Sequence, residues 1–254
     1  MQLSRFCQAA ILSSTILVIP PSSLHAAQEP GSAAAAGAPA QGMAQAPHQV
    51  DLKAIGGTQR WRTLIAGGRN RLPDHERLIV VSGAGEVVRR RDGDVGGVSV
   101  PPEWMPLLRD HAAEVTLAHN HPGGQSLSRD DLAQFEKPAV AIILAVGHDG
   151  SFYAAAAGRM YDSATFAGAY AAASSEIERL LRLRAPGSAS ALHLHRNHLV
   201  ALALAQSHVI LYRAELAQDR REAFTSCGLL FGDLVRGAAA WVRGRPVGQI
   251  GAGR

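Results

Sequence analysis

The feature that most constrains the fold is an apolar strand that runs directly into a histidine-rich turn and then into a helix. Residues 114–118 predict a strand, and the chain continues as His119-Asn-His121-Pro-Gly-Gly. Side chains two residues apart on a strand point to the same side, so the two imidazoles can converge on one point. Ser128-x-x-Asp131 then predicts a helix start with a carboxylate in the first turn. The segment therefore predicts a strand–turn–helix unit that carries three potential metal ligands.

These three residues suit a zinc ion. The imidazoles of His119 and His121 and one carboxylate oxygen of Asp131 form a ligand set that Zn²⁺ accepts while keeping a fourth position open to water. The chain has only two cysteines, Cys7 and Cys227, which excludes a disulfide-dense scaffold and a cysteine-ligated zinc finger. Zinc lowers the pKa of bound water toward neutrality, but hydrolysis also needs a base that moves protons.

A carboxylate from another part of the chain should supply this base. We choose Glu76, which precedes a predicted strand, and Glu86 and Glu114 are the alternatives. Ser128 can donate a hydrogen bond to the oxyanion that develops on an attacked carbonyl. Ser128 and Asp131 also have the spacing of a capping box, which would stabilise the helix without any metal. The two interpretations are compatible, because a capped helix presents its carboxylate in a fixed place.

The motif resembles that of JAB/MPN-type (JAMM) metalloproteases. The sequence His-Asn-His-Pro-Gly-Gly is similar to that of RadC-like and bacterial toxin-associated JAB domains. The resemblance covers about residues 75–157. Six residues separate His121 from Ser128, whereas the eukaryotic and RadC versions have seven. Some bacterial toxin-type JAB domains share the shorter loop, so we interpret it as a mark of that subfamily.

The resemblance implies a fold, an activity and a role for each residue. The fold would be α/β, with a mixed β-sheet flanked by helices in a JAB/MPN-like, cytidine-deaminase-like layering. The activity would be zinc-dependent hydrolysis of a peptide or isopeptide bond in a peptide or protein substrate. His119, His121 and Asp131 would bind zinc, Glu76 would be the general acid/base, and Ser128 would polarise the intermediate.

Two other functions stay open. The domain can be a binding or scaffold module that keeps the fold without catalysis, or a RadC-like protein associated with nucleic acid. The net charge of +4 is spread along the chain without a concentrated basic and aromatic surface, so we expect no nucleic-acid partner. An amidohydrolase barrel also begins with His-x-His after a strand, but its eight strand–helix units would not fit within residues 51–160.

Composition divides the chain into four parts. Residues 1–27 resemble a secretory signal peptide, with an apolar run too short to span a bilayer comfortably. Residues 28–50 are rich in Ala, Gly and Pro and predict a flexible linker. Residues 51–160 would form the JAB-like domain and 161–254 a helical C-terminal extension. We therefore expect a periplasmic or secreted protein without stable membrane insertion after signal cleavage.

Hydrophobic patterns and turn residues place the individual elements. Strands are predicted over 77–82, 86–89, 114–118, 139–146 and 151–156. Helices are predicted over 53–66, 101–109, 128–136, 163–184, 190–218 and 221–242. We interpret Tyr161 and Tyr170 as packing aromatics. The histidines His193, His195 and His198 lack a carboxylate or cysteine at ligand spacing, so a packing or solvated role is favoured over a second metal site.

Overall fold

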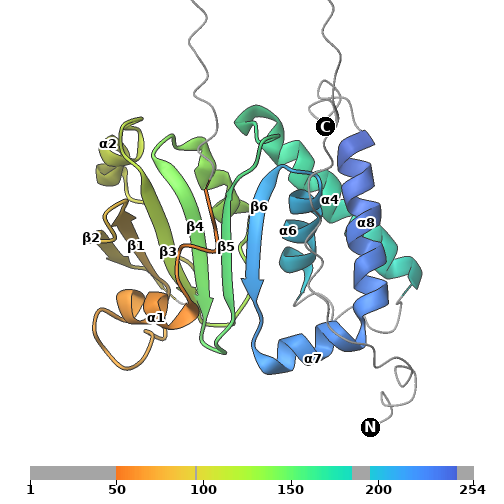
Figure 1. Ribbon diagram of the computed structural model, residues 1–254, viewed down its shortest axis with the longest axis horizontal. Helices are drawn as coiled ribbons and strands as arrows, with labels where there is room; N and C mark the ends of the chain where they lie inside the picture. The colour runs from red at the N-terminus through yellow and green to blue at the C-terminus, as the bar shows by residue number, and fades with distance from the viewer. Residues whose placement is uncertain (1–49, 95, 185–194, 245–254) are drawn as a thin grey trace, which may run out of the picture. The chain divides into compact units, whose positions relative to one another are not determined.

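The computed structural model describes residues 50–94, 96–184 and 195–244, and its strands form one sheet (Figure 1). The strands are β1 (Arg77–Ser82), β2 (Val87–Asp92), β3 (Val115–His121), β4 (Val140–Gly147), β5 (Phe152–Ala157) and β6 (Ile210–Glu215). The helices are α1 (Thr58–Ala66), η1 (Pro102–Trp104), α2 (Met105–Leu108), α3 (Arg129–Leu132), η2 (Ala133–Glu136), α4 (Ser163–Arg184), α6 (Arg196–Gln206), α7 (Gln218–Ser226) and α8 (Gly228–Gly244). The predicted signal peptide and residues 28–49 of the predicted linker lie outside the described residues.

The six strands lie in the order β2-β1-β3-β4-β5-β6. β3 and β4 pair in parallel, and every other neighbouring pair is antiparallel. The prediction of an α/β fold with a mixed sheet flanked by helices is therefore confirmed. The parallel pair lies at the centre of the sheet, and the two histidines of the motif are at the end of β3.

The two faces of the sheet carry separate hydrophobic cores because successive side chains of each strand point to opposite sides. Leu117 belongs to the core shared with α4, α6 and α8, and its neighbour Ala118 belongs to the core shared with α1. His119 and His121 continue the alternation of Leu117, so they lie on the face that the C-terminal helices cover. Those three helices pack against one another (Figure 1).

The prediction of one helix over residues 190–218 is wrong for its second half. The helix α6 ends at Gln206, and His208 takes a left-handed conformation with φ 61° that reverses the chain. The following residues form β6, which pairs with β5 at the edge of the sheet. Ile210, Tyr212 and Ala214 pack against the core, whereas Leu211 and Glu215 are exposed. This period-two pattern is typical of a half-buried strand, so the C-terminal region is not purely helical.

The other differences concern where elements begin and end. α1 begins at Thr58 rather than at residue 53, after two glycines that disfavour a helix. β3 extends through both histidines instead of ending before them. The predicted helix over residues 221–242 is two helices, α7 and α8. Across the described ranges, no helix has the length and apolarity needed to span a membrane.

Candidate metal centre

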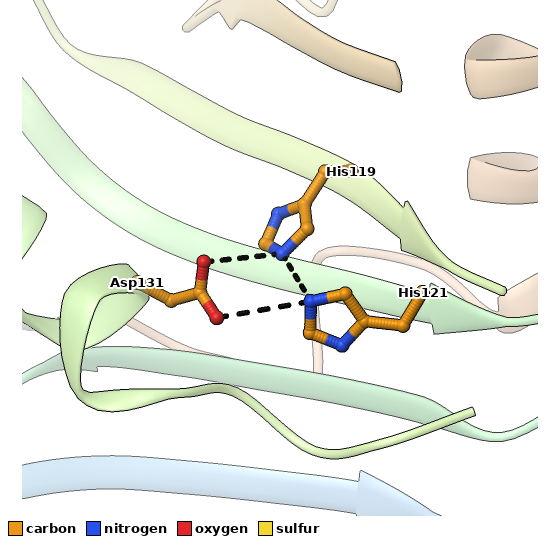
Figure 2. A group of neighbouring side chains, drawn as sticks. All are labelled: His119, His121 and Asp131. Atoms are coloured by element: carbon orange, nitrogen blue, oxygen red, sulfur yellow. Dashed lines mark hydrogen bonds and ion pairs between the residues drawn. The ribbon is translucent and has the colours of Figure 1, made fainter. Parts of the chain in front are cut away.

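The last residues of β3 bring the two histidines of the motif together. The His119 and His121 side chains are buried, and their Nε2 atoms lie 2.8 Å apart. Figure 2 shows both rings directed toward the carboxylate of Asp131, which comes from α3. Asp131 Oδ1 is 3.2 Å from His119 Nε2, and Asp131 Oδ2 is 3.8 Å from His121 Nε2. The structure therefore assembles the three residues that the motif predicted as ligands.

A tight turn after β3 fixes the orientation of His121. The Gly124 N–H donates to the His121 carbonyl at 2.9 Å, and Gly124 has φ 66°, a conformation that glycine adopts without strain. A Cβ on Gly124 would lie 2.5 Å from the Asp149 carboxylate, so a side chain does not fit there. The turn brings the Gln125 carbonyl to 2.7 Å from His121 Nδ1. Because a carbonyl only accepts, Nδ1 carries the proton and Nε2 offers its lone pair.

The capping box of α3 fixes the third ligand. The Ser128 hydroxyl and backbone N–H each donate to Asp131 Oδ2 at 2.7 Å, and the Asp131 N–H donates back to Ser128 Oγ at 3.1 Å. The predicted capping box is confirmed. Since Oδ2 is held by Ser128, Oδ1 is the oxygen that faces His119. The hydroxyl proton of Ser128 is directed at Asp131, so stabilisation of an oxyanion would require that hydroxyl to rotate.

The spacing of the three ligand atoms suits a small divalent cation. Ligands about 2.0–2.1 Å from a tetrahedral zinc ion are about 3.3 Å from one another. His119 Nε2 is 2.8 Å from His121 Nε2 and 3.2 Å from Asp131 Oδ1, both close to that value. The shortest approach of the Asp131 carboxylate to His121 Nε2 is 3.8 Å, through Oδ2. His119, His121 and Asp131 thus form a buried group that can hold a metal ion.

The Asp131 carboxylate supplies the negative charge of the group. Burial would raise the pKa of Asp131, but His119 and then His121 outweigh burial and hold it well below its usual range, so Asp131 is ionised. Burial, followed by the repulsion of His119, lowers the pKa of His121 to about 4. Burial also acts to lower the pKa of His119, but the Asp131 carboxylate more than offsets it and the net shift is upward. The site therefore offers one ionised carboxylate and a neutral His121 at neutral pH, and a metal ion that binds His119 has to displace the proton that Asp131 stabilises there.

Glu76 lies beside this group because of the strand register. β1 runs antiparallel to β3 with Leu78 opposite His119, so continuing the register by two residues places Glu76 opposite His121. Glu76 Oε1 is 4.0 Å from His121 Nε2. Burial raises the pKa of Glu76, with His119 opposing that shift. A carboxylate with a raised pKa beside a possible metal site has the properties of a proton-transferring group.

The two alternative carboxylates lie elsewhere. Glu86 is exposed in the turn between β1 and β2. Glu114 is exposed just before β3, five residues from His119, which along a strand is about 16 Å. Of the three candidates, Glu76 is the one that the fold brings to the histidines.

Asn120 is a residue of the site that our sequence analysis missed. It lies between the two histidines, so its fully buried side chain points to the opposite side of β3. Asn120 Oδ1 accepts from the Arg77 N–H at 2.9 Å, and Nδ2 donates to the carbonyls of Pro73 and His75 at 3.1 and 2.9 Å. These bonds hold the backbone on both sides of Glu76. A signal was present, since a polar residue inside a buried strand needs hydrogen-bond partners.

Replacing Asn120 with alanine should destabilise the protein and displace Glu76. Three buried backbone groups lose their partner, and we expect a loss of about 2–4 kcal/mol in the free energy of unfolding. Urea unfolding measures this loss. Asn197, at the start of α6, is half-buried and accepts one hydrogen bond, from the Tyr170 hydroxyl at 3.3 Å, so the matched change Asn197→Ala should cost only about 1 kcal/mol. Equal losses in the two variants would contradict the role of Asn120.

Two clefts are lined in part by members of the group, and they share the segment 96–98, Asp130 and Asp131. The first has a volume of about 880 Å³, contains His119, and has the apolar side chains of Leu117 and Met105 in its wall. The second, of about 650 Å³, contains Glu76, His121 and Ser128. Members of the ligand group therefore line both clefts.

The C-terminal histidines have a packing role, as predicted. His195 and His198 are buried, and both rings contact Phe224 in the core. His193 lies outside the described residues. Within the described ranges, His119, His121 and Asp131 are the one group whose geometry can hold a metal ion. The predicted packing role of Tyr161 and Tyr170 is also confirmed, since both rings contact Phe166.

Acid should destabilise the protein through His198. Burial, followed by the nearby His195, lowers the pKa of His198 to about 3. The folded-state pKa is therefore below the value of about 6.5 in an unfolded chain. Unfolding then takes up a proton below about pH 6.5, and the resulting loss of stability grows as the pH falls toward 3. At pH 4 this loss is roughly 3 kcal/mol.

The change His198→Asn removes the titrating ring but keeps a hydrogen-bonding atom near the position of Nδ1. Between pH 7 and pH 4, the variant should therefore lose roughly 3 kcal/mol less unfolding free energy than the wild type. Urea unfolding at both pH values measures the difference. An equal decline in both proteins would show that His198 is not the group responsible.

Comparison with known proteins gives no relative: no family model, curated protein or solved structure matches the chain. The resemblance to JAB/MPN metalloproteases thus rests on the motif residues alone.

Proposed function

We propose that this protein is a zinc-dependent amide hydrolase of the JAB/JAMM type, a metallopeptidase that cleaves peptide or isopeptide bonds. The observation that carries the proposal is the position of Glu76, whose Oε1 lies 4.0 Å from His121 Nε2 in a cleft beside a possible metal site. A binding or scaffold module would not need a half-buried carboxylate with a raised pKa at this place.

The donor set supports zinc over calcium and magnesium. Two imidazole nitrogens and one carboxylate oxygen suit zinc, whereas calcium and magnesium prefer oxygen ligands. Zinc, when bound, supplies a Lewis acid that activates water and polarises a carbonyl group. His121 is held in the tautomer that presents Nε2, and Asp131 is held ionised with Oδ1 directed at His119. His121 and Asp131 are therefore oriented before the ion arrives.

Glu76 is the group that transfers the proton from the attacking water to the leaving amine. Its carboxylate accepts a proton from the attacking water and returns it to the leaving amine, so the same group acts first as base and then as acid. Burial raises its pKa, which brings the carboxyl closer to the pH at which both transfers are efficient. Ser128 holds Asp131 in place, and we further propose that its hydroxyl turns to the developing oxyanion during the reaction.

The two clefts favour a chain-like substrate. They meet at Asp131 and the segment 96–98 and have volumes of about 880 and 650 Å³, so residues on both sides of a scissile amide have room. A peptide or protein satisfies this shape better than a small amide. The signal-like residues 1–27, with an apolar run over 9–20, support export, and we propose a periplasmic or secreted location.

The proposal is tested with the purified full chain and two sets of substrates, linear peptides and isopeptide-linked peptides. We expect release of free amine from at least one set, loss of release after treatment with a chelator, and recovery on adding zinc. Hydrolysis that a chelator does not affect would contradict a metal mechanism. A protein that binds zinc at the three ligands but cleaves neither set would favour the binding module.

A further inference from the structure

A chain of buried polar groups links the C-terminal region to the turn that follows the histidines. The hydroxyl oxygen of Tyr212, on β6, lies 2.7 Å from Ser126 Oγ. The same hydroxyl lies 2.8 Å from Nδ1 of His198, on α6. Ser126 and His198 are both buried. The three side chains thus connect α6 and β6 to the turn through one shared hydroxyl.

The protonation states of these groups determine which one donates and which one accepts each hydrogen bond. Burial lowers the pKa of His198 to about 3, so its ring is neutral and can offer an acceptor nitrogen. Burial raises the pKa of Tyr212 well above its ordinary value, so the hydroxyl keeps its proton. Ser126 can then donate to Tyr212 while Tyr212 donates to His198. Every member of the link is satisfied, which is the condition under which a buried polar network adds rigidity.

Two further bonds hold the same turn. Arg220 of α7 donates to the Gly123 carbonyl at 2.8 Å and to the Asp149 carboxylate at 2.5 Å. Tyr153 of β5 donates to the Gly124 carbonyl at 3.2 Å. Three side chains thus hydrogen-bond to residues 123–126, and two of them, Tyr212 and Arg220, belong to the C-terminal region.

The anchored turn contains the group that orients a metal ligand. The Gln125 carbonyl, which accepts from His121 Nδ1, belongs to the peptide bond that joins Gln125 to Ser126. Fixing the Ser126 side chain therefore fixes the carbonyl. Partners that orient a ligating histidine typically change metal affinity 10- to 100-fold when they are removed.

We propose that the C-terminal region is a positioning element of the metal centre, in which Tyr212, supported by His198, holds the Gln125–Ser126 peptide that orients His121. This proposal rests on the metal-binding part of the proposed function and not on the hydrolytic reaction. It assigns a role to residues that lie outside the motif and more than 75 positions beyond His121 in the sequence.

The test is titration of the full-length apoprotein with Co²⁺, whose visible absorption reports the geometry of its ligands. The change Tyr212→Phe removes one hydroxyl and keeps the aromatic ring. We expect its Co²⁺ affinity to fall about tenfold and the intensity or position of its absorption bands to change. Ser126→Ala removes the other end of the same bond, so it should have a similar effect. The double variant should bind Co²⁺ about as strongly as either single variant, because each single change already removes the same hydrogen bond.

The matched control is Ser207→Ala, also in the C-terminal region. Ser207 is buried and donates to the carbonyls of Ala203 and Ala239, which lie away from the turn. It should lower the melting temperature while leaving Co²⁺ affinity and absorption unchanged. Unchanged Co²⁺ binding in both Tyr212→Phe and Ser126→Ala would overturn the proposal, and so would an equal loss of affinity in Ser207→Ala. Absence of Co²⁺ and Zn²⁺ binding by the wild type would instead refute the metal centre itself.

Discussion

Replacing His121 with alanine is expected to weaken zinc binding at least about a hundredfold and to abolish zinc-dependent amide hydrolysis. The change removes one of three protein ligands and leaves the Asp131 charge with a single imidazole beside it. Two remaining ligands cannot build the three-ligand site that zinc enzymes use. Competition with a chromophoric chelator measures the affinity, and amine release measures the reaction.

His111→Ala is the matched control for this experiment. His111 is exposed in the loop between α2 and β3, so its loss removes an imidazole without touching the site. Zinc affinity and hydrolysis should stay within about twofold of the wild type. If His121→Ala retains full zinc loading and activity, His121 is not a ligand and the assignment of the site is wrong.

Replacing Glu76 with glutamine should separate metal binding from catalysis. Glutamine keeps the shape of the side chain but cannot accept and return a proton at neutral pH. We expect zinc affinity within about threefold of the wild type and hydrolysis slower by a factor of about 10²–10⁴, the usual contribution of general acid–base catalysis. Steady-state kinetics on the zinc-loaded variant, with zinc content measured in the same sample, give both quantities.

The alternative carboxylates supply the controls. Glu86→Gln and Glu114→Gln change exposed side chains away from the histidines and should leave hydrolysis unchanged. If Glu114→Gln lost activity while Glu76→Gln kept it, our choice of base would be wrong. If none of the three variants lost activity, proton transfer would have to come from a group other than these.

Local signals made the centre of the fold predictable. The two histidines and the capping box lie within 13 residues, and their geometry follows from strand alternation and from N-cap chemistry. The order of elements from β1 to β5 follows from apolar runs separated by glycine and proline. Glu76 was harder to choose, because Glu86 and Glu114 were also candidates in the sequence and the pairing of β1 with β3 decides among the three.

Long-range partners account for what the sequence analysis missed. β6 was assigned to a helix because the alanine-rich residues before it have high helix propensity, whereas its pairing partner β5 lies more than 50 residues earlier. The alternation of Ile210, Tyr212 and Ala214 was a local signal for the strand, but a short one. Asn120 was missed because its partners, Pro73, His75 and Arg77, are 43–47 residues away in the sequence.

The most direct test of the central claim is a crystal structure of the zinc-loaded protein with diffraction recorded at the zinc absorption edge. We expect one anomalous peak about 2.0–2.2 Å from His119 Nε2, His121 Nε2 and Asp131 Oδ1. The carboxylate of Glu76 should face the open coordination position. An anomalous peak at other residues, or a fully loaded crystal without a peak at these three ligands, would contradict it.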